Sequence, residues 1–441
     1  MNEKDVSMIP NVISVRERLR LRASETDKFK AGFLSVSAVL PIREDAYMTT
    51  LLLAVLLRGS EKYKTVAAIN RRLDELYGTE ISLRNHYCGA LHVIGLCADV
   101  LGAEYLPSNE SVLDEAIDVM RELLFHPLLD ENGLLQAHYV ESEKKLQCDS
   151  IRAQRNNPHT YAVERAAALV YEGTPLAHPI LGDEARVMAV TPEALTAHWR
   201  RIVKEISLDC FFVGSECPTR VAAALDAAFG KELSDSEAAW HAPLPERRPE
   251  RDTRRAEDAL AITQSHLIMV YNGGVMLCDE ALYAVIVFNE ILGGSPVSKL
   301  FMNVRERLGL CYSCHSAYNA YRGTLTVSCG LADASMELAE REIGAQIAAI
   351  AEGHVTDAEW EAAKRSLCNA YRQMEDSPVS MERFFFGRSL CGVSRSLSDC
   401  RRAIEAVTRE EVAAFARTLR LDTVFSLHAT EDGEVNDDEE D

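Results

Sequence analysis

Hydrophobic and polar positions in the first half of the chain follow two different periods. Apolar residues alternate with small or polar ones over residues 29–40, as in a strand, and a helical spacing follows directly. Further strands are predicted at residues 81–86 and 92–99, and helices at 49–57, 65–77, 111–124, 134–154 and 160–171. Gly78 stands where it would end the second of these helices in a left-handed conformation.

The second half of the chain repeats this kind of pattern. Strands are predicted at residues 265–271, 311–318 and 324–330, and helices at 280–292, 298–307, 336–352 and 357–374. Runs of strands followed by runs of helices are typical of α+β domains with a largely antiparallel sheet. We therefore predict an α+β protein made of two homologous α/β sandwiches.

Matching segments recur at a spacing of roughly 220 residues, which indicates a duplication. Thr191 and Thr408 each stand before an acidic first turn, where an N-cap residue is expected. Each of the helices that follow leads into a predicted strand, at residues 208–213 and 423–428. A repeat of this length indicates two duplicated domains rather than a solenoid.

A charged stretch that contains several prolines separates the two halves and is typical of an exposed linker. This pattern predicts domains at residues 1–230 and 257–430, with the linker at 231–256. Residues 431–441 are strongly acidic, and we expect them to form a disordered tail.

The composition narrows the class of protein. The chain has 441 residues and a formal net charge of −21, so it lacks the basic balance that nucleic acid requires. Its longest apolar run, residues 51–57, is too short to span a bilayer, and residues 1–22 show no signal-peptide pattern. We therefore expect a cytoplasmic protein that binds neither nucleic acid nor membrane and keeps its 12 cysteines reduced.

One group of residues resembles a cofactor motif. Residues 311–315 read C-Y-S-C-H, which matches the C-x-x-C-H pattern of covalent haem attachment. On a regular strand, however, Cys311 and Cys314 would point to opposite faces. We therefore predict neither haem nor zinc here, and we expect His86 and His92 to be surface or hydrogen-bonded histidines rather than ligands.

Two segments of the second half carry the most specific motifs. Residues 291–301 read I-L-G-G-S-P-V-S-K-L-F, and residues 304–313 read V-R-E-R-L-G-L-C-Y-S. They resemble the glycine-rich loop and the V-R-E-x-x-G-L-A-Y-S signature of the pitrilysin/insulinase-type metallopeptidases, which are inverzincins. Residues 179–182 and 189–191 also resemble this family. The resemblance covers nearly the whole chain and implies the family's pitrilysin-like duplicated fold.

The same resemblance implies that the family's zinc site has been lost. The H-x-x-E-H helix of the family aligns with residues 50–60, which places its two histidines on Thr50 and Ala54 and its catalytic glutamate on Leu53. The third ligand, a glutamate, aligns with Ser150. None of these four residues fits a zinc site of this kind. The resemblance thus implies a chain without a metal or cofactor, which is not an enzyme on its own.

Arg305 and Tyr312 are family residues that this chain keeps. In the family, an Arg/Tyr pair of this kind faces the zinc site, where it would hold a peptide carbonyl or an oxyanion. The alternative is an ordinary surface arginine and a sheet tyrosine. Gly293 and Gly294 correspond to a flexible loop near bound peptide, or else they form a simple turn between helices.

The resemblance implies a function in partnership. We expect a non-catalytic subunit of a bacterial pitrilysin-type heterodimer, whose active sister subunit carries zinc and cleaves a peptide substrate. A structural or scaffolding pseudo-peptidase is the alternative, and an autonomous homodimer with unrelated hydrolase chemistry is a third hypothesis. Residues 73–78, 105–107 and 298–301 further resemble a bacterial subgroup associated with the 5-aminopentanol modification of elongation factor P.

Overall fold

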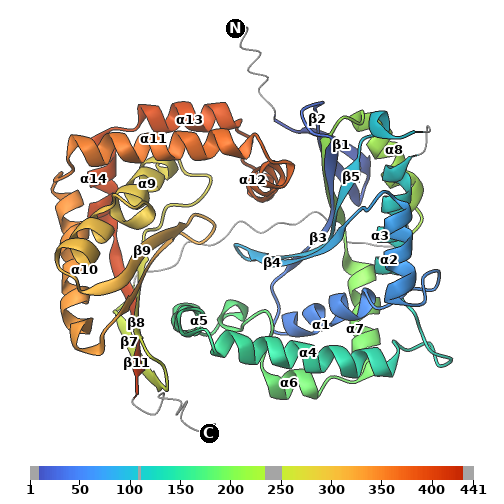
Figure 1. The fold of residues 1–441 in the computed structure, drawn as a ribbon, viewed down its shortest axis with the longest axis horizontal. Coiled ribbons are helices and arrows are strands. Elements are labelled where there is room, and N and C mark those ends of the chain that lie inside the picture. The colour runs from blue at the N-terminus through green and yellow to red at the C-terminus, as the bar shows by residue number, and fades with distance from the viewer. Residues whose placement is uncertain (1–8, 108–110, 234–250, 431–441) are drawn as a thin grey trace, which may run out of the picture. The chain divides into compact units, whose positions relative to one another are not determined.

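The computed structural model describes residues 9–107, 111–233 and 251–430. Contacts divide these residues into two compact units, each built from one sheet and the helices that cover it (Figure 1). Unit 1 takes the described residues up to 151, together with 178–233 and 374–396. Unit 2 takes residues 152–177, 251–373 and 397–430.

Six strands form the sheet of unit 1. Their order is β1 (Asn11–Arg16), β2 (Leu19–Glu25), β6 (Leu208–Gly214), β3 (Ala31–Pro41), β5 (Leu91–Leu101) and β4 (Ile81–Cys88). β2 and β6 run parallel, and the other neighbouring pairs are antiparallel. The helices are α1 (Ala46–Leu56), α2 (Val66–Glu75), η1 (Ala103–Tyr105), α3 (Val112–Phe125), most of α4 (Ala137–Arg155), α6 (Glu184–Met188), α7 (Pro192–Glu205), α8 (Pro218–Phe229) and α12 (Pro378–Leu390).

Five strands form the sheet of unit 2. Their order is β7 (Arg254–Leu260), β11 (Arg420–Ala429), β8 (Ser265–Asn272), β10 (Thr324–Leu331) and β9 (Cys311–Asn319). β7 and β11 run parallel, and the other neighbouring pairs are antiparallel. The helices are α5 (Pro158–Val170), η2 (Pro175–Ala177), α9 (Leu282–Asn289), the π-helical turns η3 (Glu290–Gly294) and η4 (Leu300–Arg307), η5 (Asp333–Ser335), α10 (Met336–Ala351), α11 (Asp357–Met374), α13 (Leu397–Ala406) and α14 (Arg409–Thr418).

The two sheets share one topology. When β7 is matched with β2, the strand order of unit 2 repeats that of unit 1 without β1, including the parallel pair made by the first and last strands. Such a repeat over a whole sheet is what duplicated domains produce. The predicted α+β fold, with two homologous and mostly antiparallel sandwiches, is confirmed.

Each unit also contains a helix from the other half of the sequence. α5 and α12 lie at equivalent places in the two halves, and each begins with a proline after a capping side chain, Asn157 or Ser377. α5 packs on β8 and β11 of unit 2, and α12 packs on β3 and β6 of unit 1. The compact units are therefore not continuous stretches of chain. The boundaries at residues 230 and 257 stay a prediction about the sequence repeat.

Parts of the predicted linker and tail lie outside the described residues. The structure resumes at residue 251, and β7 already begins at Arg254, inside the stretch assigned to the linker. The predicted tail, residues 431–441, is not described. Within the described ranges, no helix is both long and apolar enough to cross a membrane.

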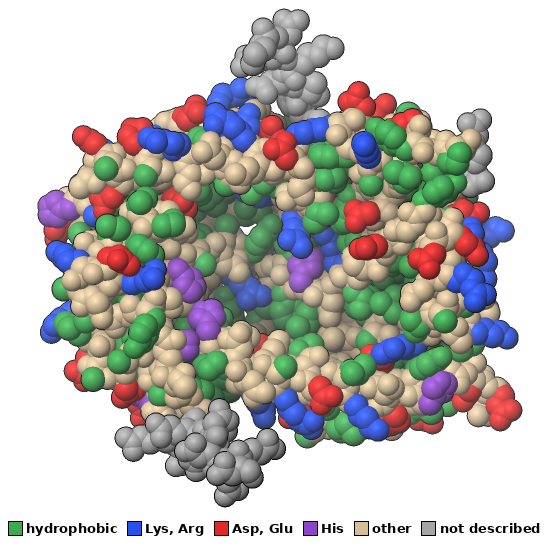
Figure 2. Space-filling view, viewed as in Figure 1, with side chains coloured by type: hydrophobic (Ala, Val, Ile, Leu, Met, Phe, Trp, Pro, Cys, Tyr) green, Lys and Arg blue, Asp and Glu red, His purple; other side chains and the backbone are tan. Residues whose placement is uncertain are grey.

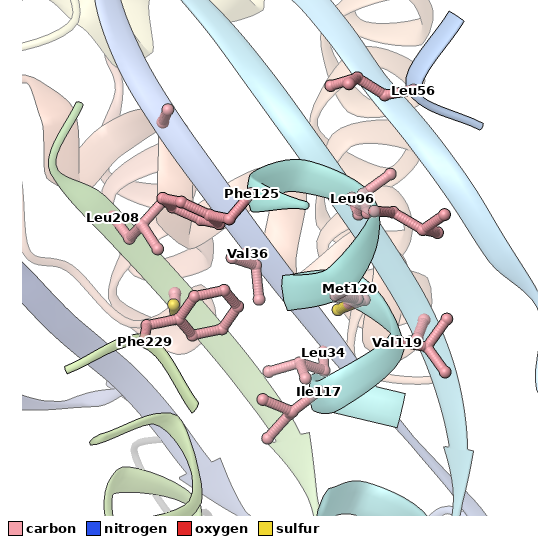
Figure 3. Close-up of a cluster of buried hydrophobic side chains, with 14 of the residues drawn as sticks. Leu34, Val36, Leu56, Leu96, Ile117, Val119, Met120, Phe125, Leu208 and Phe229 are labelled. Atoms are coloured by element: carbon pink, nitrogen blue, oxygen red, sulfur yellow. The ribbon is translucent and has the colours of Figure 1, made fainter. Parts of the chain in front are cut away.

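The core of unit 1 lies between its sheet and α3, with α8 alongside (Figure 3). Leu34 from β3 lies against Ile117 from α3, Leu208 from β6 lies beside Phe125 at the end of the same helix, and the ring of Phe229 lies nearby. All five side chains are almost fully buried. α3 can supply this face because its apolar residues recur at helical spacing, whereas its charged residues other than the buried Glu122 lie away from the core.

The N-terminal strands β1 and β2 were not predicted, although residues 19–24 of β2 read L-R-L-R-A-S, in which apolar and polar residues alternate as in a strand. Arg20 and Arg22 of β2 both pair with Asp209, a fully buried residue of the neighbouring strand β6. This carboxylate lies nearly 200 residues away in the sequence, and its single negative charge pairs with both arginines only once the sheet has formed. The local sequence therefore does not reveal how the two arginines are accommodated.

Candidate functional site

The position of the family's catalytic glutamate lies in the hydrophobic core of unit 1. Leu53 is only 3% exposed and packs with the other apolar residues of α1 and of the sheet. Ala54 follows it and is partly buried. α1 is apolar over most of its length, so it is held by burial on nearly every side. An aliphatic side chain at this position can neither activate water nor bind a metal ion.

Thr50, at the position of the first histidine ligand, takes part in a network of hydrogen bonds. Its hydroxyl lies 2.9 Å from the carbonyl oxygen of Ile180, to which it donates, and it accepts from Asn85 Nδ2 at 2.9 Å. Asn85 lies on β4, and its Oδ1 is 2.6 Å from Nε2 of His92 on β5. The network links α1 to two strands and to the loop that precedes α6.

His92 is therefore buried and hydrogen-bonded, as predicted. Burial in the sheet lowers the pKa of His92 to about 4, with a further contribution from the charge of His86. The ring also makes an edge contact with Tyr87, with 5.3 Å between the ring centroids. At neutral pH the imidazole is thus uncharged and serves as a structural hydrogen-bonding group.

Ser150, at the position of the third ligand, lies on an exposed face of α4. Its hydroxyl donates to the carbonyl oxygen of Leu146 in the same helix at 2.9 Å. Gln147 is the residue of α4 that reaches α1, where its amide donates to the carbonyl oxygen of Tyr47 at 3.1 Å. Earlier in α4, the buried Glu143 pairs with Arg58, just beyond the end of α1.

The zinc ion that the family implies does not fit these residues. The four aligned positions offer two hydroxyl groups, both engaged in hydrogen bonds to backbone oxygens, and two aliphatic side chains. Among the described residues, one group of side chains lies close enough together to share a metal ion. It consists of three cysteines of unit 2, which are remote in sequence from this site. No catalytic step through zinc can therefore be derived for this chain.

Arg305 lies on η4 and is partly exposed. Its guanidinium stacks over the ring of Phe301, 4.6 Å from the centroid, and its Nε lies 3.6 Å from a carboxylate oxygen of Glu306. Gly309 then reverses the chain with a φ of +61°, a conformation that glycine adopts without strain. Its amide donates to the carbonyl oxygen of Arg305 at 3.1 Å, and β9 begins directly afterwards at Cys311.

Tyr312 is held outward by a β-bulge. On β10, Leu331 pairs with Cys311 and Gly330 pairs with Ser313, so Tyr312 is the extra residue of β9. Both Tyr312 and Ser313 are exposed, and the tyrosine side chain is 71% exposed although large aromatic residues are usually buried. β9 is an edge strand of its sheet, so the phenol is presented beside unpaired backbone groups.

The bulge also overturns a prediction about the cysteines. Cys311 and Cys314 do not point to opposite faces, because the extra residue shifts the alternation by one position. Both are buried, and both lie with Cys329 of β10 in a cluster whose sulfur atoms are all within 4.8 Å of one another. The argument that we used against a shared ligand at this motif is therefore wrong.

Gly293 and Gly294 lie in the π-helical turn η3. A Cβ on Gly293 would stand 2.6 Å from the backbone nitrogen of Ser316 on β9, so this glycine allows close packing between the turn and the strand. A Cβ on Gly294 would stand 2.7 Å from a carboxylate oxygen of Glu290. Contact with bound peptide remains a prediction for both residues.

The acidic excess of the sequence does not form one patch on the face shown in Figure 2. Acidic and basic side chains are interspersed there over both units. A basic partner would need a concentrated negative surface for steering, and this face offers none.

A family model matches part of the chain, and known proteins are similar to most of it. Residues 189–367 match the family described as the peptidase M16 inactive domain. The probable inactive metalloprotease YmfF of Bacillus subtilis is 28% identical over 408 residues, which cover 92% of this chain and 95% of that protein. The uncharacterized zinc protease YmxG of the same organism is 26% identical over 330 residues, which cover 72% of this chain and 76% of that protein.

Solved structures share the fold. A conserved protein from Enterococcus faecalis V583 has a TM-score of 0.89 at 24% identity, with 97% of this chain and 100% of that chain covered. A peptidase M16 inactive domain from Pseudomonas fluorescens has a TM-score of 0.77 at 18% identity, with 96% and 98% covered.

These findings support the resemblance of the chain to inactive proteins of the M16 type, and the family model matches residues 189–367. They also support a non-catalytic protein, in agreement with the prediction made from its residues. The subgroup associated with elongation factor P stays a prediction.

Proposed function

We propose that this chain is the non-catalytic subunit of a bacterial M16-type heterodimer. The active sister subunit would carry H-x-x-E-H and zinc, and the two chains together would cleave a peptide substrate in the cytoplasm. Support comes from the family match and from the four positions of the zinc site, which are built into the core and into hydrogen bonds of unit 1. The chain itself would contribute no cofactor to this chemistry.

The observation that carries the proposal is the exposure of Tyr312. Burying a tyrosine ring gains free energy, so a fold that holds one outward on a bulge keeps it available for a ligand or a partner. Arg305 lies near the end of η4, and the turn at Gly309 separates it from Tyr312 on β9. A guanidinium and a phenol are donors that can hold a peptide carbonyl and stabilise the oxyanion formed when a metal-bound hydroxide attacks it.

Strand β9 supports a second part of the proposal, the binding of extended peptide. It lies at the edge of its sheet in unit 2, with Tyr312 near its beginning. An edge strand offers backbone N–H and C=O groups to a peptide that adds as a further strand. Backbone hydrogen bonds would then give affinity without requiring a particular peptide sequence.

The test is a mixing assay with a candidate H-x-x-E-H sister chain. Each chain alone and both together would be incubated with a quenched peptide library, and cleavage would be followed by fluorescence. We expect activity only in the mixture, with a loss of at least about tenfold for Arg305→Ala or Tyr312→Phe, as for other oxyanion-stabilising groups. Zinc-dependent cleavage by this chain alone would overturn the proposal.

Matched variants separate a role in catalysis from a role in assembly. Tyr77→Phe changes another exposed tyrosine, and Arg341→Ala changes another exposed arginine of unit 2, so both should leave activity unchanged. Gel filtration of each mixture would show whether the complex is intact. Loss of activity with an intact complex supports the proposed contacts.

The alternative is a scaffolding pseudo-peptidase without a catalytic contribution. The hydrogen bonds of Thr50 to Ile180 and Asn85 support this alternative, because they give a structural role to a residue that aligns with a zinc ligand. It predicts that Arg305→Ala and Tyr312→Phe leave the activity of the mixture unchanged while both chains still associate. That result would replace the proposed function with the scaffold.

A further inference from the structure

Three buried cysteines converge between β9 and β10 of unit 2. Cys311 and Cys314 come from β9 and Cys329 from β10, and Cys329 is only 1% exposed. Cys314 and Cys329 lie directly opposite each other in the register, and their sulfur atoms are 2.6 Å apart. All three sulfur atoms lie within 4.8 Å of one another.

The bulge at Tyr312 creates this cluster. Without it, Cys311 would lie on the opposite face of the sheet from Cys314, and only the cross-strand pair would remain. The extra residue brings Cys311 onto the buried face beside the other two. The bulge in β9 thus places three sulfur atoms together on the buried face of the sheet.

Ordinary core packing does not require such convergence. Other buried cysteines of the chain, such as Cys210 in β6 and Cys368 in α11, occupy separate places as small apolar residues do. By contrast, the ligand atoms of Cys311, Cys314 and Cys329 lie close enough together to hold a metal ion, and they form the group of this kind found among the described residues.

We propose that Cys311, Cys314 and Cys329 form a trithiolate site for a soft d10 metal ion, Zn²⁺ or Cu⁺. Thiolate sulfur is the ligand that these ions prefer in proteins. With metal–sulfur bonds of about 2.3 Å, the three sulfur atoms would stand roughly 4 Å apart, which small rotations of the side chains can reach from their present positions. This site is separate from the family's zinc site, and it departs from our expectation of a chain without metal.

Binding would exchange protons for the ion. Three thiols release three protons and form three metal–sulfur bonds, so a Zn²⁺ site would carry one net negative charge and a Cu⁺ site two. The ion would join β9 to β10 and fix the bulge that exposes Tyr312.

The experiment is a metal titration of the full chain, purified metal-free under reducing and anaerobic conditions. A background with Cys217→Ser and Cys278→Ser removes two exposed thiols that could bind metal adventitiously. ZnCl₂ or Cu⁺ held in acetonitrile would be added, and the metal retained after desalting would be measured. Co²⁺ as a probe would report thiolate ligation through its charge-transfer absorbance.

We expect one equivalent of Zn²⁺ or Cu⁺ in this background, and a loss of at least tenfold in affinity for Cys314→Ser. Cys368→Ser, a change at another buried cysteine of unit 2, should retain the metal. If Cys314→Ser fails to fold by circular dichroism, Cys311→Ala offers the same test at the more exposed edge of the cluster.

Three results would overturn the proposal. The folded chain could retain less than stoichiometric amounts of both ions, or the variant lacking all three cysteines could retain as much as the parent. Thiol counting and mass could also show that Cys314 and Cys329 form a disulfide in the protein as purified without reductant, with no metal bound after reduction. None of these outcomes depends on a sister chain or on peptide cleavage.

Discussion

The buried ion pair between Arg84 and Glu382 gives a quantitative test of how α12 is held in unit 1. Arg84 of β4 is 8% exposed and Glu382 of α12 is fully buried, and the guanidinium contacts both carboxylate oxygens. Ser35 donates a third hydrogen bond to Glu382 at 3.1 Å. Burial lowers the pKa of Arg84, but the hydrogen bond and charge of Glu382 outweigh this effect and raise it overall.

Glu382→Ala should destabilise the attachment of α12 by about 3 to 5 kcal/mol, because it leaves a buried guanidinium without its counter-charge. Hydroxyl contacts with Ser37, at 3.0 Å, and with Ser35, at 3.4 Å, would remain for the guanidinium, but neither carries a counter-charge. The double variant Arg84→Met/Glu382→Leu should recover most of this loss, since two apolar residues of similar size need no partner. Glu205→Ala removes an ion pair with Arg43 that is exposed on both sides, and it should cost less than about 1 kcal/mol.

Hydrogen exchange measured by mass spectrometry suits this prediction, because a chain with two units need not unfold in one step. Peptides from α12 and β3 would report the opening free energy in unit 1, and peptides from α10 would serve as the reference in unit 2. The reasoning fails if Glu382→Ala changes the protection of α12 no more than Glu205→Ala does. It also fails if the double variant is as unprotected as the single one.

Three further predictions concern other parts of the fold. The pKa of His92 is about 4 in the folded chain, below its value of about 6.5 in the unfolded chain. Its contribution to the free energy of unfolding should therefore be complete above about pH 6.5 and fall as the pH drops toward 4. His92→Gln should flatten this dependence in thermal melts. Gly293→Ala should lower the free energy of unfolding by about 1 to 3 kcal/mol, because its Cβ would strike the backbone of Ser316. Gly344→Ala lies in open space on α10 and should raise it by about 0.5 to 1 kcal/mol. Urea melts that rank the two variants alike would contradict this. Thr50→Val should cost about 1 to 3 kcal/mol, since it leaves the partners of the hydroxyl unsatisfied, and an unchanged melting temperature would show that the network adds no stability.

The residues that we align with the family's zinc site have structural roles in this chain. Histidines at positions 50 and 54 would need an open, polar surface, whereas Leu53 now lies in the core and Thr50 is bonded to Ile180 and Asn85. Once these groups are satisfied by one another, restoring a single ligand would remove a contact without completing a metal site.

The sequence by itself determined the properties that depend on local pattern and on residue type. Alternation and helical spacing located most strands and helices, and equivalent caps such as Thr191 and Thr408 indicated the duplication that the two sheets share. The identities of residues 50, 53, 54 and 150 were enough to exclude the family's zinc chemistry, because a ligand requires particular atoms.

The tertiary structure decided what depends on partners far apart in the chain. The two arginines of β2 are accommodated in the sheet by Asp209, which pairs with both, and Glu382 of α12 finds its partner in Arg84 of β4. The bulge at Tyr312 appears only once β9 is paired with β10, and it both exposes the phenol and brings three cysteines together. Register and long-range charge pairing arise from the folded neighbours of a residue, and the local sequence carries no signal for either.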